Sequence, residues 1–122
     1  DTKAYIDNNY IYAKNKEEAQ KCIYRNAKDI FNNRIKRIKP LFSDIPEFTL
    51  KVRKMTSRWG VCNKKSMSIT LNIELITKDI NLIDYVIIHE LCHFEYMNHS
   101  KDYWNYVAQF YPYYKQARKL LK

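Results

Sequence analysis

Apolar side chains recur at helical spacing over the first long stretch of the chain, between Asn15 and Pro40. They fall three and four residues apart, at Ala19, Cys22, Ile23, Ala27, Ile30, Phe31, Ile35 and Ile38. Asn15 followed by Glu18 resembles a capping box, which satisfies the first free backbone N–H groups of a helix. Pro40 lacks the N–H donor that would continue one. The pattern therefore predicts one long amphipathic helix that ends near Pro40.

A second helical pattern begins at Asn81, with Asp84 three residues later as a capping partner. Its apolar and histidine positions are Leu82, Ile83, Val86, Ile87, His89, His93, Phe94 and Met97. Ser100 can cap a third helix that stops near Pro112, and residues 114–121 predict a fourth.

Strand patterns are shorter. Apolar and polar residues alternate over residues 48–53, which predicts a half-buried strand. A second strand is expected at 67–72, after turn-forming residues at 63–66, and the two are expected to pair as a hairpin with 67–72 at the edge. Short aromatic and β-branched pieces flank residues 7–9, which predicts a hairpin near the N-terminus. The fold class is therefore α+β, with a small antiparallel sheet and about four helices.

Composition narrows the class of protein. The chain has 122 residues, 46% of them apolar and 15% aromatic, which predicts one small domain and excludes a disordered chain. No run of eighteen apolar residues occurs, and the N-terminal residues lack the pattern of a signal peptide, so a cytoplasmic protein without membrane contact is expected. Three cysteines at unpaired spacing argue against a disulfide scaffold.

The net charge of +9 is concentrated in the first half of the chain, where 14 basic and 7 acidic residues occupy residues 1–58. Such an excess favours an anionic partner, and the basic end of the first helix is a possible contact surface for nucleic acid. The cations Arg34, Lys36, Arg37 and Lys39 also suit the negative end of the helix dipole. Ordinary solvated surface is therefore the simpler interpretation.

All three histidines fall within eleven residues, in the segment that starts His89-Glu90-Leu91-Cys92-His93. On a helix His89 and His93 are about 40° apart and one turn separated, so both imidazoles can point at one metal ion. Glu90 lies about 100° from His89, where its carboxylate can reach a metal-bound water as general base. Cys92 is expected to be a packed thiol and Glu95 to face solvent.

His99 cannot join this pair from a continued helix, because ten residues on it would lie about 15 Å along the axis. Asn98 tolerates the left-handed conformation, so the helix is expected to end there and return His99 as a third ligand. Three neutral imidazoles and a water form the open site that catalytic Zn²⁺ uses. Asp102, the alternative carboxylate, falls where it favours the next helix start.

Several segments together resemble the YgjP-like metallopeptidase family. They are Ser57-Arg58-Trp59-Gly60-Val61-Cys62, then Ile69-Thr70-Leu71-Asn72, then Ile83 to His93, then Asn98-His99-Ser100 with Tyr103-Trp104. The resemblance spans roughly residues 50–120. It implies a zincin-like minimal domain of the bacterial cytosol, with the HExxH motif on a central helix. It also implies ligation by His89, His93 and His99, Glu90 as base, and a cleft lined by Arg58 and Trp59.

The same resemblance suggests a division of the chain into residues 1–14, a hairpin or remnant of a missing N-terminal lobe, and residues 15–122, the zincin-like metallopeptidase domain. The histidine spacing is also similar to the metzincin pattern, but Tyr96 stands where those enzymes have glycine. The turn before His99 is therefore expected to differ.

The function predicted is hydrolysis of peptide bonds by a zinc-activated water, with Glu90 as general base. Arg58, Tyr96 and Tyr103 are candidate oxyanion donors, and Trp59 a further candidate substrate contact. Two alternatives stay open: a nucleic-acid-associated module stabilised by zinc, and a metal-dependent amidase acting on a small substrate. Glu90 favours the enzyme because a structural zinc site needs no general base.

Overall fold

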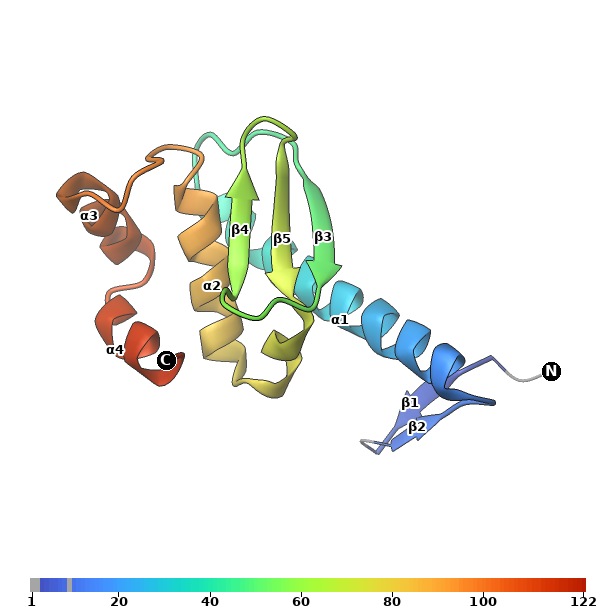
Figure 1. Ribbon diagram of the computed structural model, residues 1–122. Coiled ribbons are helices and arrows are strands. Elements are labelled where there is room, and N and C mark those ends of the chain that lie inside the picture. Colours follow the sequence, from blue (N-terminus) through green and yellow to red (C-terminus); the bar gives the residue numbers. More distant parts are fainter. Residues whose placement is uncertain (1–2, 9) are drawn as a thin grey trace.

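The computed structural model describes residues 3–8 and 10–122. Its central element is helix α2 (Ile80–Cys92), which lies between a three-stranded sheet and the pair α3 (Lys101–Phe110) and α4 (Tyr114–Leu120) (Figure 1). The long helix α1 (Lys16–Ile38) passes behind the sheet and carries the N-terminal hairpin at its far end. The α+β class and the four predicted α-helices are confirmed.

Helix α1 begins where the sequence predicts. The Asn15 side chain accepts a hydrogen bond from the backbone N–H of Glu18 at 2.8 Å. Near its other end, Arg34 donates two hydrogen bonds of 2.8 Å to the Asp84 carboxylate, which joins α1 to α2. A 3-10 turn, η1 (Lys39–Leu41), follows the helix at Pro40. The long helix is therefore confirmed. The bidentate ion pair between Arg34 and Asp84 aligns it with α2, the helix of the histidine motif.

The three-stranded sheet differs from the prediction. It contains β3 (Thr49–Arg53), β4 (Gly60–Asn63) and β5 (Ser68–Asn72) in the order β3–β5–β4. Strand β3 pairs with β5 in parallel and β4 pairs with β5 antiparallel, so the predicted hairpin between 48–53 and 67–72 is wrong. The prediction of 67–72 as an edge strand is also wrong, because β5 is central and all five of its residues are buried.

The physical reason lies in the turn before β5. The Asn63 side chain accepts hydrogen bonds from the N–H groups of Lys65 and Ser66, at 2.9 and 3.1 Å. This closes a tight connection between β4 and β5, so these two strands form the hairpin. Strand β4 is only four residues long and has no alternating pattern, which hid it in the sequence. It forms the edge of the sheet next to α2.

Helix α2 is shorter than predicted. It starts after Asp79 rather than Asn81 and ends at Cys92, six residues before Asn98. The N–H of His93 bonds to the carbonyl of Glu90 at 3.1 Å, which tightens the last turn and starts the change of direction. Among the described residues other than glycine, only Asn8 and Met67 have a positive φ, so the left-handed turn expected at Asn98 is wrong.

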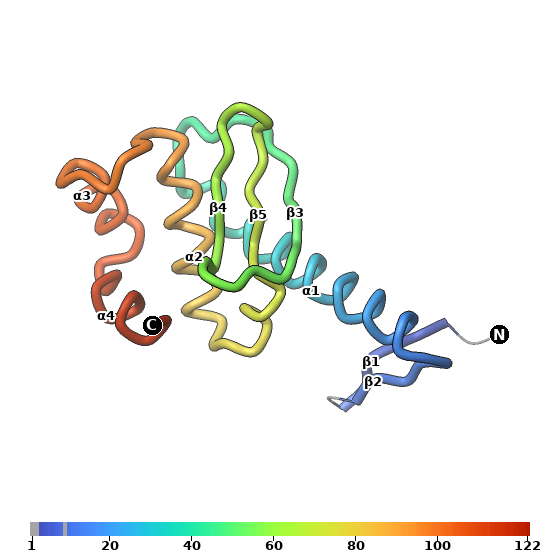
Figure 2. Tube along the Cα trace, viewed as in Figure 1, coloured from blue at the N-terminus to red at the C-terminus, as the bar shows by residue number. Residues whose placement is uncertain are grey.

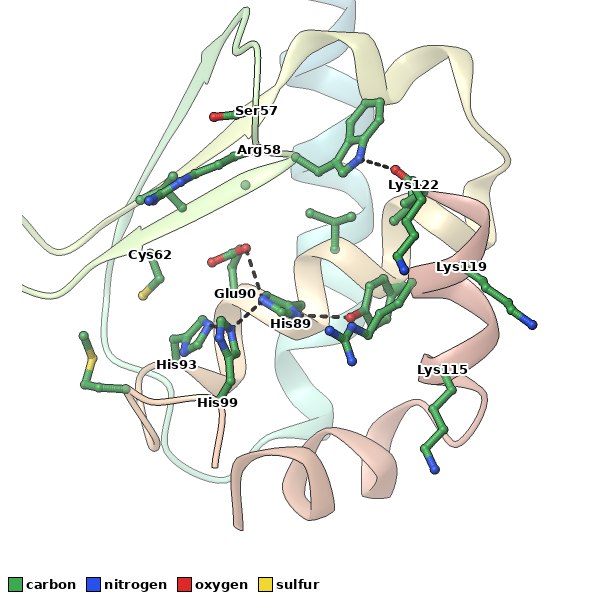
Figure 3. A pocket seen from close by; sticks show the side chains of 18 residues that line it. Ser57, Arg58, Cys62, His89, Glu90, His93, His99, Lys115, Lys119 and Lys122 are labelled. Carbon is green, nitrogen blue, oxygen red and sulfur yellow. Dashed lines mark hydrogen bonds and ion pairs between the residues drawn. The ribbon is translucent and has the colours of Figure 1, made fainter. Parts of the chain in front are cut away.

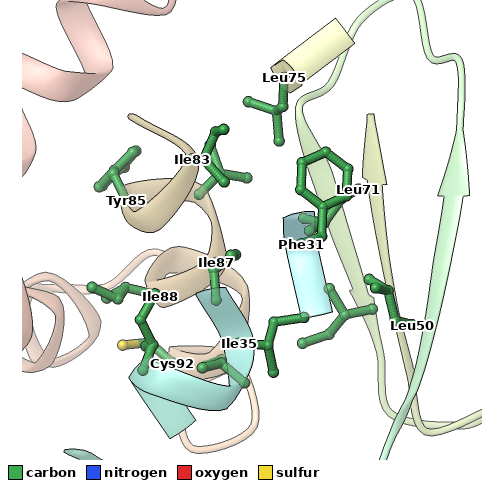
Figure 4. Packing of buried hydrophobic residues seen from close by; sticks show 14 of the residues in the cluster. Phe31, Ile35, Leu50, Leu71, Leu75, Ile83, Tyr85, Ile87, Ile88 and Cys92 are labelled. Atoms are coloured by element: carbon green, nitrogen blue, oxygen red, sulfur yellow. The ribbon is translucent and has the colours of Figure 1, made fainter. Parts of the chain in front are cut away.

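The hydrophobic core fills the space between α1, α2 and the sheet (Figure 4). Phe31, Leu71 and Leu91 are fully buried, and Cys92 is packed among them as predicted. Burial of each such side chain contributes about 1.5–3 kcal/mol. One face of α2 is therefore tied to the core, while its His89 and Glu90 positions face the opposite side.

The N-terminal hairpin projects from the far end of α1 (Figures 1 and 2). Strands β1 (Tyr5–Asp7) and β2 (Tyr10–Tyr12) are antiparallel and exposed throughout, which confirms a hairpin here. Asn8 has φ 49°, as its tolerance of the left-handed region allows, whereas Asn9 lies outside the described residues. Within the described part of the chain, no helix is long and apolar enough to cross a membrane.

Candidate active site

The three histidines converge on one point (Figure 3). His89 projects from the last turn of α2, His93 caps the end of that helix, and His99 arrives from the loop before α3. The Nε2 atom of His99 lies 3.1 Å from Nε2 of His93 and 3.3 Å from Nε2 of His89. The structure therefore brings together all three residues that the sequence singled out.

These spacings suit a metal ion. Two nitrogens bound to a tetrahedral zinc at about 2.0–2.1 Å lie about 3.3 Å apart. Burial lowers the pKa of His89 to about 3, and the neighbouring His93 and His99 reinforce this. Burial also lowers the pKa values of His93 and His99. The imidazoles are therefore neutral at physiological pH, which is the form that binds metals.

Outer hydrogen bonds orient the two helical histidines. The Tyr85 hydroxyl lies 3.1 Å from Nδ1 of His89. Nδ1 of His93 donates to the carbonyl of Tyr96 at 2.9 Å, which leaves its Nε2 unprotonated and directed at the cluster. Partners of this kind typically fix the tautomer and ring orientation of metal-binding histidines. Tyr85 is a residue that the sequence analysis missed.

Glu90 lies beside the cluster and is 5% exposed. Its Oε2 atom is 3.9 Å from Nε2 of His89. Burial raises the pKa of Glu90 to about 8, although the charge of Arg58 and a hydrogen bond from the Cys62 backbone act in the opposite direction. A carboxylate whose pKa is near neutrality can both accept and release a proton there.

Gly60 gives Glu90 its space. A Cβ atom on Gly60 would lie 3.0 Å from Cγ and Oε2 of Glu90 and 3.1 Å from Cγ1 of Val86. Such distances are shorter than ordinary van der Waals contacts. The single glycine of the chain therefore permits the close approach of β4 to α2, and its φ is not positive.

A cavity of about 700 Å³ opens over the histidines and Glu90. Arg58 and Trp59 line it, as the resemblance implied, together with Cys62. Tyr96 and Tyr103 do not line it. Tyr103 is fully buried and its hydroxyl donates to the carbonyl of His89 at 2.7 Å, so it cannot contact a substrate there.

Tyr96 lies on the other side of the segment that follows α2. Its ring packs against Tyr106, and both residues line a separate, smaller cavity of about 200 Å³. Its side chain is therefore turned away from the histidine cluster, and the expectation that Tyr96 contacts the substrate is not supported by its position.

Helix α4 forms one side of the main cavity, which the sequence analysis did not foresee. Its contribution includes Lys115, Arg118 and Lys119, and Lys122 follows two residues after the helix ends. These four cations are spaced i, i+3, i+4 and i+7, a stripe along one helical face that was visible in the sequence. Its position next to the histidines depends on tertiary packing, and the spacing alone cannot reveal that.

The comparison with known families decides which class of protein carries this site. The model of the YgjP-like metallopeptidase domain matches residues 1–122. The chain belongs to this family. It is a metallopeptidase, and the three-histidine cluster of this YgjP-like domain implies a bound metal ion.

Solved structures similar to this YgjP-like domain include two metallopeptidase zymogens. Jannalysin of Methanocaldococcus jannaschii has a TM-score of 0.51 and 24% identity, over 70% of this chain and 81% of that one. Abylysin of Pyrococcus abyssi has a TM-score of 0.58 and 21% identity, over 81% of this chain and 88% of that one. At these identities the likeness shows a shared fold. Comparison with curated proteins finds no match.

Proposed function

We propose that this YgjP-like domain is a zinc-dependent peptidase in which His89, His93 and His99 hold the ion and Glu90 is the general base. The observation that carries the proposal is the convergence of three neutral Nε2 atoms next to a buried carboxylate, at the base of an open cavity. Zinc bound there would act as a Lewis acid and lower the pKa of a water molecule.

Glu90 would take a proton from the attacking water and pass it to the nitrogen of the leaving amine. Its burial supports this role, because the raised pKa allows both transfers near neutral pH. The Cys62 backbone hydrogen bond orients the carboxylate, and the absence of a side chain at Gly60 leaves room for it. Arg58 is the remaining candidate for stabilising negative charge on the substrate, since it lines the cavity and its charge acts on Glu90.

Strand β4 is suited to align an extended peptide. It is the edge strand next to α2, and its residues Gly60, Val61 and Cys62 line the cavity. A peptide that adds to this edge would gain backbone hydrogen bonds without a sequence requirement. The sequence predicted that residues 67–72 form the edge strand that aligns the peptide. Because β5 is central, we assign this role to β4.

The test combines metal analysis with hydrolysis. The purified protein should contain one zinc per chain and cleave members of an unbiased peptide library. Glu90→Gln should retain the zinc and lose at least about a hundredfold in kcat, because an amide cannot accept the proton. Glu95→Gln is the matched control, since Glu95 is exposed and lies outside the main cavity.

Full activity of Glu90→Gln would remove this residue from the mechanism. Zinc binding without cleavage of any peptide would favour one of the two alternatives, and the two are separable. Hydrolysis of small amides would indicate an amidase, whereas salt-sensitive binding of nucleic acid by α1 would indicate a binding module.

A further inference from the structure

The main cavity has an unbalanced charge. Its lining includes five cations, Arg58, Lys115, Arg118, Lys119 and Lys122, and Glu90 is its only acidic residue. Within residues 3–8 and 10–122, none of the five forms an ion pair with a carboxylate. Elsewhere in the molecule, Arg34 is paired with Asp84 and Lys39 with Glu47. Apart from Glu90, the cations of the cavity therefore have no acidic partner within the described residues and can bind an anion from outside.

Arg118 is connected to the histidine cluster through an aromatic ring. Its guanidinium carbon lies 4.4 Å from the ring centroid of Trp104. The same indole is stacked against His99, with centroids 5.5 Å apart, and lies 5.7 Å from His89. Trp104 is thus a shared platform that positions one guanidinium next to two of the three proposed ligands.

Helix α4 is fixed in this position at both ends. Tyr114 stacks on Trp104 with centroids 5.0 Å apart, and the Trp59 indole donates to the carbonyl of Leu121 at 2.9 Å. Arg118 lies between these two anchors. Lys115 and Lys119 extend from the same helix away from the histidines (Figure 3), so they add long-range attraction rather than direct contact with the site.

Guanidinium groups favour carboxylates because two parallel N–H groups match the two oxygens. Arg118 is separated from His99 and His89 by a single ring, because Trp104 contacts the guanidinium and both imidazoles. A substrate carboxylate at Arg118 would therefore lie within one or two residues of the scissile bond, on the α4 side of the cavity.

We propose that Arg118 binds a carboxylate of the peptide substrate, so that the enzyme prefers peptides with an acidic side chain or a free C-terminus next to the cleavage site. This inference rests on the proposed peptidase function and adds the substrate class. Lys122 and Arg58 lie in the same lining and supplement the positive field.

The experiment uses pairs of fluorescein-labelled peptides that differ only by Glu or Gln at one position, moved stepwise along a fixed sequence. A further pair carries a free or an amidated C-terminus. Hydrolysis is measured as kcat/KM with the zinc-loaded protein, and binding as anisotropy with zinc-loaded Glu90→Gln. At one position the Glu peptide, or the peptide with the free C-terminus, should be favoured by about tenfold in both measurements.

Three variants assign the preference to Arg118. Arg118→Gln should bring the ratio of acidic to neutral peptide close to one, whereas Arg118→Lys should keep part of it because the charge remains. Arg37→Gln makes the same charge change on the exposed surface of α1, outside the cavity, and should keep the full ratio.

Equal binding and cleavage of acidic and neutral peptides at every position would overturn the inference, and so would a preference that survives Arg118→Gln unchanged. If no peptide is cleaved while the binding preference persists and depends on Arg118, the carboxylate site stands and the peptidase proposal fails. The two hypotheses are thus tested separately.

Discussion

The two sides of the cavity are built differently. On the side formed by α2 and β4, Glu90 is 5% exposed, and Gly60 leaves no room for one additional carbon. On the side formed by α4, Lys115, Arg118 and Lys119 are exposed and unpaired within the described residues. In the proposed mechanism, the packing of the first side positions the reacting groups, and the charge of the second side selects the substrate.

The difference follows from what lies behind each side. The opposite face of α2 is part of the main core, so a displacement of Glu90 also disturbs residues such as Leu91. Helix α4 has seven residues and buries only Ala117 within its bounds. We therefore expect changes on the α2–β4 side to reduce metal binding or kcat, and changes on the α4 side to alter selectivity and local stability.

The largest effect is expected at His99, the exposed member of the cluster. His99→Ala should weaken zinc binding by at least about a hundredfold and abolish hydrolysis, because two ligands hold the ion poorly. Asp102→Ala is the control and should keep full zinc content, since Asp102 lies in the first turn of α3, and it should lose at most about 1 kcal/mol of stability.

The zinc stoichiometry of the two variants decides whether His99 or Asp102 is the third ligand. A fully loaded His99→Ala next to an empty Asp102→Ala would assign the third ligand to the carboxylate and place the metal away from the point where the Nε2 atoms converge. That result would also contradict the difference between the α2–β4 side and the α4 side, because metal binding would then depend on Asp102 in the exposed first turn of α3.

A smaller but still large effect is expected at Gly60. In Gly60→Ala the new Cβ would press on Glu90 and Val86 at about the distances given above, so Glu90 must shift. A displacement of this kind costs about a hundredfold in kcat, and the strain costs about 1–3 kcal/mol in stability. Zinc content should stay at one per chain, because no ligand is touched.

Steady-state kinetics with metal analysis provide the measurement for Gly60→Ala. A loss confined to KM would mean that Gly60 affects peptide alignment on β4 rather than the position of Glu90. Loss of zinc would mean that the whole of α2 moves, and the side formed by α2 and β4 would then be less rigid than its packing indicates.

The part of this site that could be predicted is the part set by local geometry. His89 and His93 face one point because a helix turns by about 100° per residue, and no tertiary contact is needed for that. The arrival of His99 was also predicted, but through a helix end at Asn98. The turn instead begins at His93, where a hydrogen bond from its own imidazole to the Tyr96 carbonyl accompanies the change of direction.

The remaining features depend on contacts between distant residues. Apolar alternation identifies a strand but not its neighbour, so the parallel pairing of Thr49–Arg53 with Ser68–Asn72 was missed. The cationic stripe of α4 was present in the sequence, yet only the contact of Arg118 with Trp104 locates it near the cluster. Tyr103 looked like a candidate substrate contact until its burial was known.

The variant Tyr85→Phe tests whether the side formed by α2 and β4 depends on residues beyond the proposed metal ligands. In Tyr85→Phe the ring remains packed but the hydroxyl next to Nδ1 of His89 is lost. Zinc affinity should fall about tenfold, the lower end of the range for outer hydrogen bonds of metal-binding histidines. Competition with a chromophoric chelator measures it.

Tyr111→Phe is the matched control for Tyr85. Tyr111 packs edge-on against the Tyr85 ring, with centroids 5.4 Å apart, but makes no hydrogen bond to the cluster. The zinc affinity of Tyr111→Phe should stay within about twofold of that of the unchanged protein. Equal losses in both variants would show that ring packing, rather than the hydroxyl, orients His89.

The smallest effect is expected where the two sides meet, at the hydrogen bond from Trp59 to the carbonyl of Leu121. Trp59→Phe keeps an aromatic ring but leaves that carbonyl without its donor, which should cost about 1 kcal/mol and lower Tm by roughly 4 °C. Because this bond anchors the C-terminal end of α4, amide hydrogen exchange should accelerate in α4 and remain slow in α2. A fall in kcat as large as that expected for Gly60→Ala would contradict this assignment. Trp59 would then belong to the side formed by α2 and β4, with the residues that position the reacting groups, and not to the boundary with the α4 side.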